Sequence, residues 1–83
     1  DMKFFIVFFF KLNLGAFVFF TPEFPTMESC VVSATNPIHI QAYSKRMFME
    51  YGKIMPIHSV ACLPENEVKD LLTLHMKDYE TEI

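Results

Sequence analysis

The sequence predicts a mainly α-helical protein with an N-terminal apolar membrane helix, a proline-rich break and then two short amphipathic helices. Three observations support this class: an apolar run over Phe4–Phe20, two prolines within Thr21–Thr26, and two later segments with apolar residues every three or four positions. A chain of 83 residues makes at most one domain. The expected organisation is an apolar anchor or signal-like segment over 1–20, a proline-containing linker over 21–35 and a small helical tail over 36–83.

The apolar run Phe4–Phe20 contains eight phenylalanines among its seventeen residues. As one helix it would be about 25 Å long, slightly short of a hydrocarbon layer of roughly 30 Å. Lys11 opposes insertion by about 2.5 to 3.5 kcal/mol, and the surrounding apolar residues offset that cost. Lys11 and Gly15 are four residues apart, so on a helix they would share one face, and we expect a partner protein to contact both.

A secretory signal is the first alternative for this segment. Lys3 would be its charged region and Phe4–Phe10 its apolar region. The small-residue pattern that a cleavage site needs, Val32–Ala34, lies well past the apolar end.

A β-hairpin is the second alternative, with Phe4–Phe10 pairing with Ala16–Phe20 across the turn KLNLG. Phenylalanine, isoleucine and valine favour strands. The apolar residues do not alternate with polar ones, however, so both faces of such a hairpin would be apolar. An uncovered sheet of that kind aggregates, which favours the helix.

The segment after the prolines predicts a first amphipathic helix over Pro37–Tyr51. Thr21–Thr26 reads as an extended break, and Met27–Ala34 as a short strand-like stretch. Asn36 caps the helix, and Pro37 occupies the first turn, where a missing N–H has no cost. The apolar stripe ends at a terminating glycine and comprises Ile40, Tyr43, Met47 and Tyr51, followed by Gly52.

A second amphipathic helix is predicted over Pro64–Tyr79, after an extended segment at Lys53–Leu63 in which Ile54, Ile57 and Val60 are expected to pack. Glu65 and Glu67 place negative charge at the helix N-terminus. One face carries Val68, Leu71, Leu72, His75, Met76 and Tyr79. Two such helices form a thin core, so we expect a larger protein or a membrane to complete it.

The charge and motifs exclude several classes of function. Residues 21–83 carry five Lys and Arg against nine Asp and Glu, so no nucleic-acid partner is expected. Cys30 and Cys62 follow no metal-binding spacing, and neither metal nor cofactor is expected. Cys62 with His58 or His39 as base is the enzymatic alternative, with Glu65 orienting the base, but the chain lacks phosphate-loop, HExxH and GxSxG motifs. We expect no enzyme and no catalytic residue.

The C-terminal tail, Glu80–Ile83, resembles type I ligands of PDZ domains, with Thr81 and Ile83 as the contact residues. Such a ligand requires a cytosolic end. The charges flanking the apolar run instead place the C-terminal part outside the cytosol.

The sequence therefore predicts a non-catalytic, single-pass, membrane-associated accessory or anchor protein that acts through protein–protein contacts. The alternative is a secreted small helical binding protein with an N-terminal signal sequence, whose helices enclose an apolar ligand.

Overall fold

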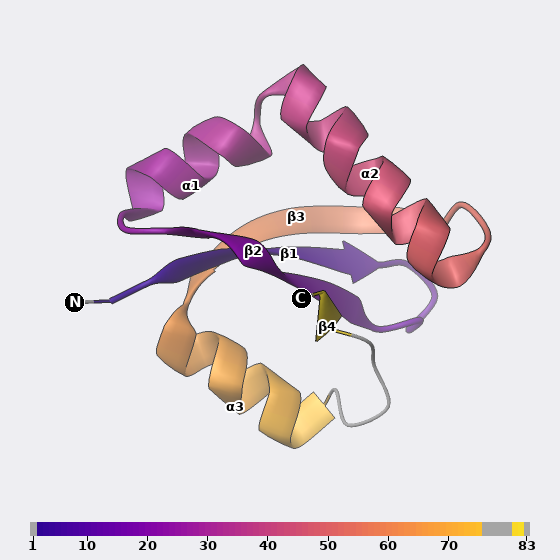
Figure 1. Cartoon of the computed structure of the whole chain (residues 1–83). Helices are drawn as coiled ribbons and strands as arrows, with labels where there is room; N and C mark the ends of the chain where they lie inside the picture. Colours follow the sequence, from indigo (N-terminus) through magenta and orange to yellow (C-terminus); the bar gives the residue numbers. More distant parts are fainter. Residues whose placement is uncertain (1, 76–80, 83) are drawn as a thin grey trace.

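The computed structural model describes residues 2–75 and 81–82 and shows an α/β fold in three layers (Figure 1). The elements follow in the order β1 (Phe4–Phe10), β2 (Ala16–Phe24), α1 (Met27–Ala34), α2 (Pro37–Tyr51), β3 (Ile57–Pro64), α3 (Glu65–His75) and β4 (Thr81–Glu82). The strand order in the sheet is β3-β1-β2-β4. Helices α1 and α2 cover one face of this sheet, and α3 covers the other.

The predicted N-terminal membrane helix is wrong, because Phe4–Phe20 folds into the hairpin formed by β1 and the first part of β2. β1 is antiparallel to both neighbours: Val7 lies opposite Val18 of β2 on one side and opposite Ala61 of β3 on the other. Within residues 2–75 and 81–82, no helix combines the length and the apolar character needed to cross a bilayer. This finding corrects the mainly α fold class and the transmembrane, single-pass, signal-anchor and membrane-localisation predictions.

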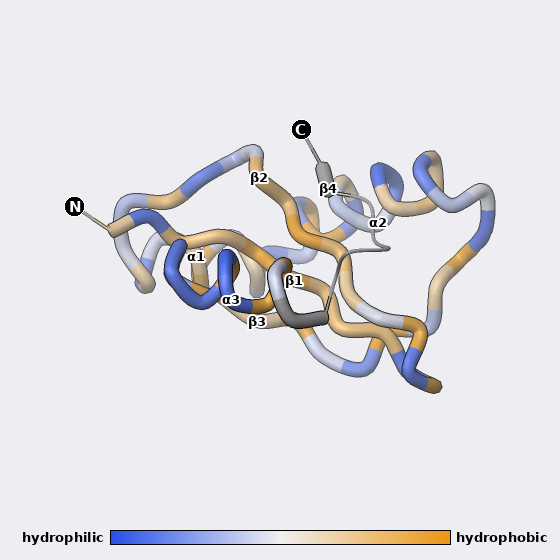
Figure 2. Tube along the Cα trace, turned by 90° about the horizontal axis from the view of Figure 1, so that it is seen from below, coloured by the Kyte–Doolittle hydropathy of each residue, from blue (hydrophilic) through white to orange (hydrophobic). Residues whose placement is uncertain are grey.

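Two buried faces explain why the hairpin shows no alternation of polar and apolar residues. Alternate residues of β1 face opposite sides of the sheet, and both sides are covered. The side toward α1 and α2 buries Ile6, Phe8, Phe10, Phe17 and Phe19. The side toward α3 buries Phe5, Val7, Ala16, Val18 and, from the helix itself, Val68. Figure 2 shows apolar colour along the hairpin strands and polar stretches on the helices.

Aromatic rings fill the layer between the sheet and α2. The Phe8 ring lies edge-on to Phe19 at 5.6 Å and to Tyr43 at 6.3 Å between ring centroids. The Arg46 guanidinium carbon lies 4.7 Å from the centre of the Phe19 ring. Side chains therefore occupy the space that the predicted secreted binding protein would use to enclose an apolar ligand.

The prediction of α2 is confirmed at both ends. Asn36 Oδ1 accepts a hydrogen bond from the Ile38 N–H at 2.9 Å, and Pro37 lies in the first turn. Gly52 follows the last residue with a φ of 72°, in the left-handed region that terminates helices. The loop between α2 and β3 therefore begins at Gly52.

The second predicted helix is present as α3, but with different bounds. It begins at Glu65 because Pro64 is the last residue of β3. Val68 is buried, and Leu71 and Leu72 pack beside it, as their spacing predicts. The predicted face residues Met76 and Tyr79 lie outside the described residues.

The strand-like prediction for Met27–Ala34 is wrong, because this segment is helix α1. Thr26 and Ser29 form a capping box: the Ser29 N–H donates to Thr26 Oγ1 at 3.0 Å, and the Thr26 N–H donates to Ser29 Oγ at 3.4 Å. The preceding residues, Thr21–Phe24, belong to β2 and include a cis peptide bond between Thr21 and Pro22.

A disulfide joins Cys30 on α1 to Cys62 on β3, with 6.0 Å between the Cα atoms. It fastens the first helix over the edge strand of the sheet. Disulfides persist in oxidising compartments, so this bond is compatible with a secreted or extracellular protein. The structure is therefore more compatible with the secreted alternative than with the membrane localisation.

Candidate interaction surface

The end of the molecule opposite the N-terminus carries two loops that lie side by side (Figure 1). The β1–β2 turn, Lys11–Gly15, and the α2–β3 loop, Gly52–Pro56, are joined by a hydrogen bond from the Lys11 N–H to the Pro56 carbonyl at 2.9 Å. We call this end the hairpin tip and define it by these two loops together with Phe48 and Met49 of the last turn of α2.

The backbone of the β1–β2 turn is left-handed at consecutive residues. Leu12 has a φ of 60° and Asn13 a φ of 56°, while the Leu14 N–H donates to the Lys11 carbonyl at 3.1 Å. Positive φ at both central residues is the requirement of a type I′ turn, where glycine, asparagine or aspartate is preferred. Asn13 fits that preference, and Leu12 does not.

The fold does not favour leucine at position 12. Its backbone conformation disfavours a bulky side chain by roughly 1 to 2 kcal/mol, and its side chain is 83% exposed, so little packing compensates. Strained positions of this kind concentrate at functional sites. Leu12 is therefore the strongest indication that the tip contacts another molecule.

Other large apolar side chains are exposed at the same end. Ile54 is 85% exposed in the α2–β3 loop, and Met49 is 74% exposed at the end of α2. A cleft of about 210 Å³ lies between α2 and this loop, lined by residues that include Met47, Phe48, Ile54 and Met55. Methionines adapt their shape to a partner, so the tip offers a deformable apolar surface.

The charges of the chain are separated between its two ends. Lys11 and Lys53 lie on the hairpin tip, with Glu50 in the neighbouring turn of α2. The far end, where β1 begins, carries Glu23, Glu28, Glu65 and Glu67, of which Glu23 and Glu65 pair with Lys3 and Lys69. The chain as a whole has a formal net charge of −3. An acidic partner would therefore favour the tip over the opposite end.

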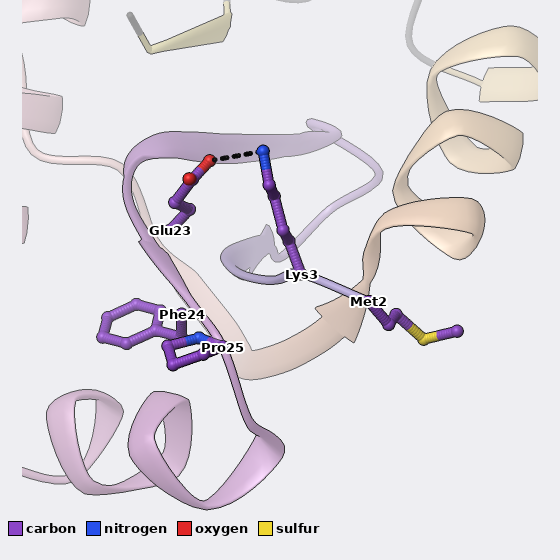
Figure 3. A pocket seen from close by; sticks show the side chains of 5 residues that line it. All are labelled: Met2, Lys3, Glu23, Phe24 and Pro25. Carbon is purple, nitrogen blue, oxygen red and sulfur yellow. Dashed lines mark ion pairs between the residues drawn. The ribbon is translucent and has the colours of Figure 1, made fainter.

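A second cleft, at the acidic end, is an open surface feature (Figure 3). It has a volume of about 410 Å³ and is lined by Met2, Lys3, Glu23, Phe24 and Pro25. Figure 3 shows Lys3 and Glu23 pointing toward one another, with 3.5 Å between Nζ and Oε1. Both charged side chains are about half exposed and neutralise each other, so this cleft offers weaker recognition than the tip.

The predicted contact residues Lys11 and Gly15 both lie in the tip, although no helix brings them together. Lys11 is exposed. Gly15 has a φ of 98°, and its carbonyl accepts the Phe10 N–H at 2.8 Å, which closes the turn. Thr81 lies in β4 beside Val18, in a parallel pairing. Ile83 lies outside the described residues, so the PDZ ligand stays a prediction.

The enzymatic alternative with Cys62 as nucleophile does not apply, because both cysteine sulfurs are in the disulfide. Cys62 has no thiol to act as a nucleophile or zinc ligand. His58 Nδ1 lies 3.2 Å from Ser59 Oγ. Within the part of the chain that the structure describes, no three His, Cys, Asp or Glu residues are grouped to hold a metal ion.

A polar network that sequence reasoning missed joins α1 to α2. Ser33 Oγ lies 2.9 Å from His39 Nδ1 and 2.8 Å from Tyr43 Oη. A serine hydroxyl beside an imidazole is the start of a nucleophilic relay. Ser33 is only 5% exposed, however, so its hydroxyl is buried between the helices. We therefore assign the network to the packing of α1 against α2. In the sequence, the local indication of this network is that His39 and Tyr43 are four residues apart.

The fold and the tip together define a small, disulfide-bonded α/β domain with an exposed apolar and cationic end. The chain matches no family model, no curated protein and no solved structure.

Proposed function

We propose that this chain is a secreted, non-catalytic binding domain that acts through protein–protein contacts at the hairpin tip. The observation that carries the proposal is Leu12, an exposed leucine held in a left-handed backbone conformation. A folded chain with no partner at this position would gain from asparagine or glycine there. The exposed Ile54, on the neighbouring loop, extends the same apolar surface.

The partner that fits this surface is a protein with an apolar groove bordered by acidic residues. Exposed leucine and isoleucine side chains supply buried area in a contact, at about 25 cal/mol per Å². Lys11 and Lys53 border them and favour carboxylates on the partner, which increases the rate of encounter. The disulfide supports action in an oxidising compartment, where it persists.

A capture experiment with matched variants tests this function. The folded wild-type chain, a tip variant carrying Leu12→Asn and Ile54→Asn, and a control variant carrying Ile38→Asn are immobilised and exposed to extracellular fluid from the source of the chain. Ile38 is also largely exposed but lies at the start of α2, away from the tip. A protein retained by the wild type and the control, but not by the tip variant, supports the proposal. Equal retention by all three contradicts it.

Lysine labelling locates the contact independently. A bound partner should protect Lys11 and Lys53 from acetylation while leaving Lys3 and Lys69, at the acidic end, reactive. Protection of Lys3 and Lys69 instead would move the contact away from the tip. Binding of the tip to anionic phospholipid vesicles, with no protein retained, would also overturn the proposal.

A further inference from the structure

Strand β3 forms an edge of the sheet, and in the described part of the chain it pairs with β1 alone. The Glu65 N–H donates to the Lys3 carbonyl at 2.8 Å, so this pair is hydrogen-bonded. Hydrogen-bonded and non-hydrogen-bonded pairs alternate in an antiparallel ladder. The N–H and C=O groups of Val60 and Cys62 therefore point away from β1, toward the open edge. The register shift between Phe9 and Phe10 interrupts this alternation at His58, and beyond it the Pro56 carbonyl accepts from the Lys11 N–H.

The open edge has only some of the features with which proteins block pairing by another chain, namely the terminal prolines and the register shift at His58. Its sequence, IHSVACLP, contains no lysine, arginine, aspartate or glutamate. Val60 is apolar and 37% exposed, and His58 is exposed beside it. Pro56 precedes the strand and Pro64 ends it. The edge is thus a short, uncharged ladder with a proline at each end.

We propose that a second copy of this chain binds this edge, with the two β3 strands antiparallel about a two-fold axis at Val60. In this register Val60 lies opposite Val60 of the second copy, and His58 lies opposite Cys62. The Val60 pair carries outward-facing N–H and C=O groups, so each Val60 finds a donor and an acceptor, and the register shift at His58 shortens the ladder on either side. Pro56 then lies opposite Pro64, and the ladder ends there because neither proline has an N–H.

The charges beside the strand favour this occupant and this orientation. Lys53 lies before β3, whereas Glu65 and Glu67 follow it in the first turn of α3. Antiparallel pairing brings the lysine end of one copy beside the glutamate end of the other, at both ends of the interface. Parallel pairing would bring like charges together. A second copy thus supplies the complementary charges that this edge requires.

Helix α1 adds apolar area to the same interface. The disulfide holds α1 over β3, and α1 exposes Met27, Val31 and Val32. A two-fold axis perpendicular to the sheet places both α1 helices on one face of the continuous sheet, beside the axis. The dimer goes beyond the proposed function: it engages Lys53 and Pro56 of the α2–β3 loop but leaves the β1–β2 turn, with Leu12, free in both copies, and so makes the domain bivalent.

Sedimentation equilibrium of paired charge variants tests the dimer and its register. The wild type should have twice the 9.7 kDa mass of the chain. Val60→Lys and Val60→Glu should each lose the dimer, because like charges meet at the axis, and a mixture of the two should recover it as a heterodimer. The matched control Met49→Lys, on the hairpin tip, should stay dimeric.

A wild-type mass of 9.7 kDa at the highest soluble concentration overturns the proposal, as does failure of the mixed variants to associate. Circular dichroism of each variant checks that it is folded, and the mixture shows that the variants retain the interface. Capture by the tip reports separately, because Val60→Lys should bind the partner as the wild-type monomer does.

Amide exchange gives a residue-level readout of the same edge. The amide of Val60, which lies on the proposed axis, should exchange more slowly at concentrations that favour the dimer than after dilution. Its neighbours Ser59 and Ala61 already face β1 and should not change. Slowing of the neighbours alone, with Val60 unaffected, contradicts the assigned edge.

Discussion

Replacing Leu12 by asparagine should stabilise the fold and weaken partner binding. The left-handed conformation costs leucine roughly 1 to 2 kcal/mol, of which asparagine, enriched in this region, should recover about 1 kcal/mol. Full burial of a leucine side chain is worth about 1.5 to 3 kcal/mol. Leu12 is 83% exposed, so its substitution loses only about a sixth of that value, about 0.25 to 0.5 kcal/mol. The net gain is about 0.5 to 0.75 kcal/mol, which raises the unfolding temperature by about 2 to 6 °C.

Thermal unfolding followed by circular dichroism measures this change, and the capture assay measures binding. Ile54→Asn is the matched control: Ile54 is as exposed as Leu12, but its backbone is not left-handed. It should weaken binding without raising the unfolding temperature. A fall in the unfolding temperature on Leu12→Asn would refute the assigned turn strain, and unchanged capture by both variants would refute the role of the tip.

Three further changes test the parts of the fold that hold the tip in place. The double change Cys30→Ala with Cys62→Ala removes a link across a sequence separation of 32 residues. It should lower the free energy of unfolding in urea by about 3 to 4 kcal/mol. A loss below about 1 kcal/mol would contradict a constraining bond. Phe8→Ala removes a ring that is 2% exposed and packed between α2 and the sheet, so it should cost about 3 to 5 kcal/mol; a near-neutral result would place Phe8 outside the core. Asn36→Ala removes the α2 cap and should lower the free energy of unfolding by about 1 kcal/mol. Asn36→Ser should retain most of that stability, because serine also caps helices. Equal losses for the two variants would argue against capping.

The sequence predicted the helices whose signals are local. Asn36, Pro37 and Gly52 mark the ends of α2 through backbone requirements that act within one turn. Val68 and the leucines after it identify α3 by spacing alone. Helix α1 was missed because Val31 and Val32 favour strands. Its cap was also inconspicuous, since serine replaces the glutamate expected three residues after Thr26.

The hairpin could not be chosen from the apolar run itself. A strand that is buried on both faces and a membrane helix both have a continuous apolar sequence. They differ in whether residues distant in the sequence cover the two faces of the segment. Tyr43 and Met47 cover one face, and Val68 covers the other. Lys11 was the local clue, because a turn places a lysine in water at no cost.

The predicted contacts of Lys11 and Gly15 with a partner stay a prediction, although both residues lie in the proposed site. Lys11 and Gly15 were expected to share a helical face and instead share a turn. Leu12 and Ile54 were not singled out, because an exposed leucine is recognised only once its backbone conformation is known. Cys30 and Cys62 are the two cysteines of the chain, so one bridge between them was possible, but the sequence left open whether it forms.

Nuclear Overhauser contacts between backbone Hα atoms test most directly whether the apolar segment is the central hairpin of the sheet. Close Hα pairs occur where antiparallel residues are opposed without hydrogen bonds. Contacts between Phe8 and Val60, and between Val7 and Val18, are therefore expected. Contacts between residues three apart along Phe4–Phe20, with neither cross-strand pair observed, would show a helix and contradict the fold on which the hairpin tip depends.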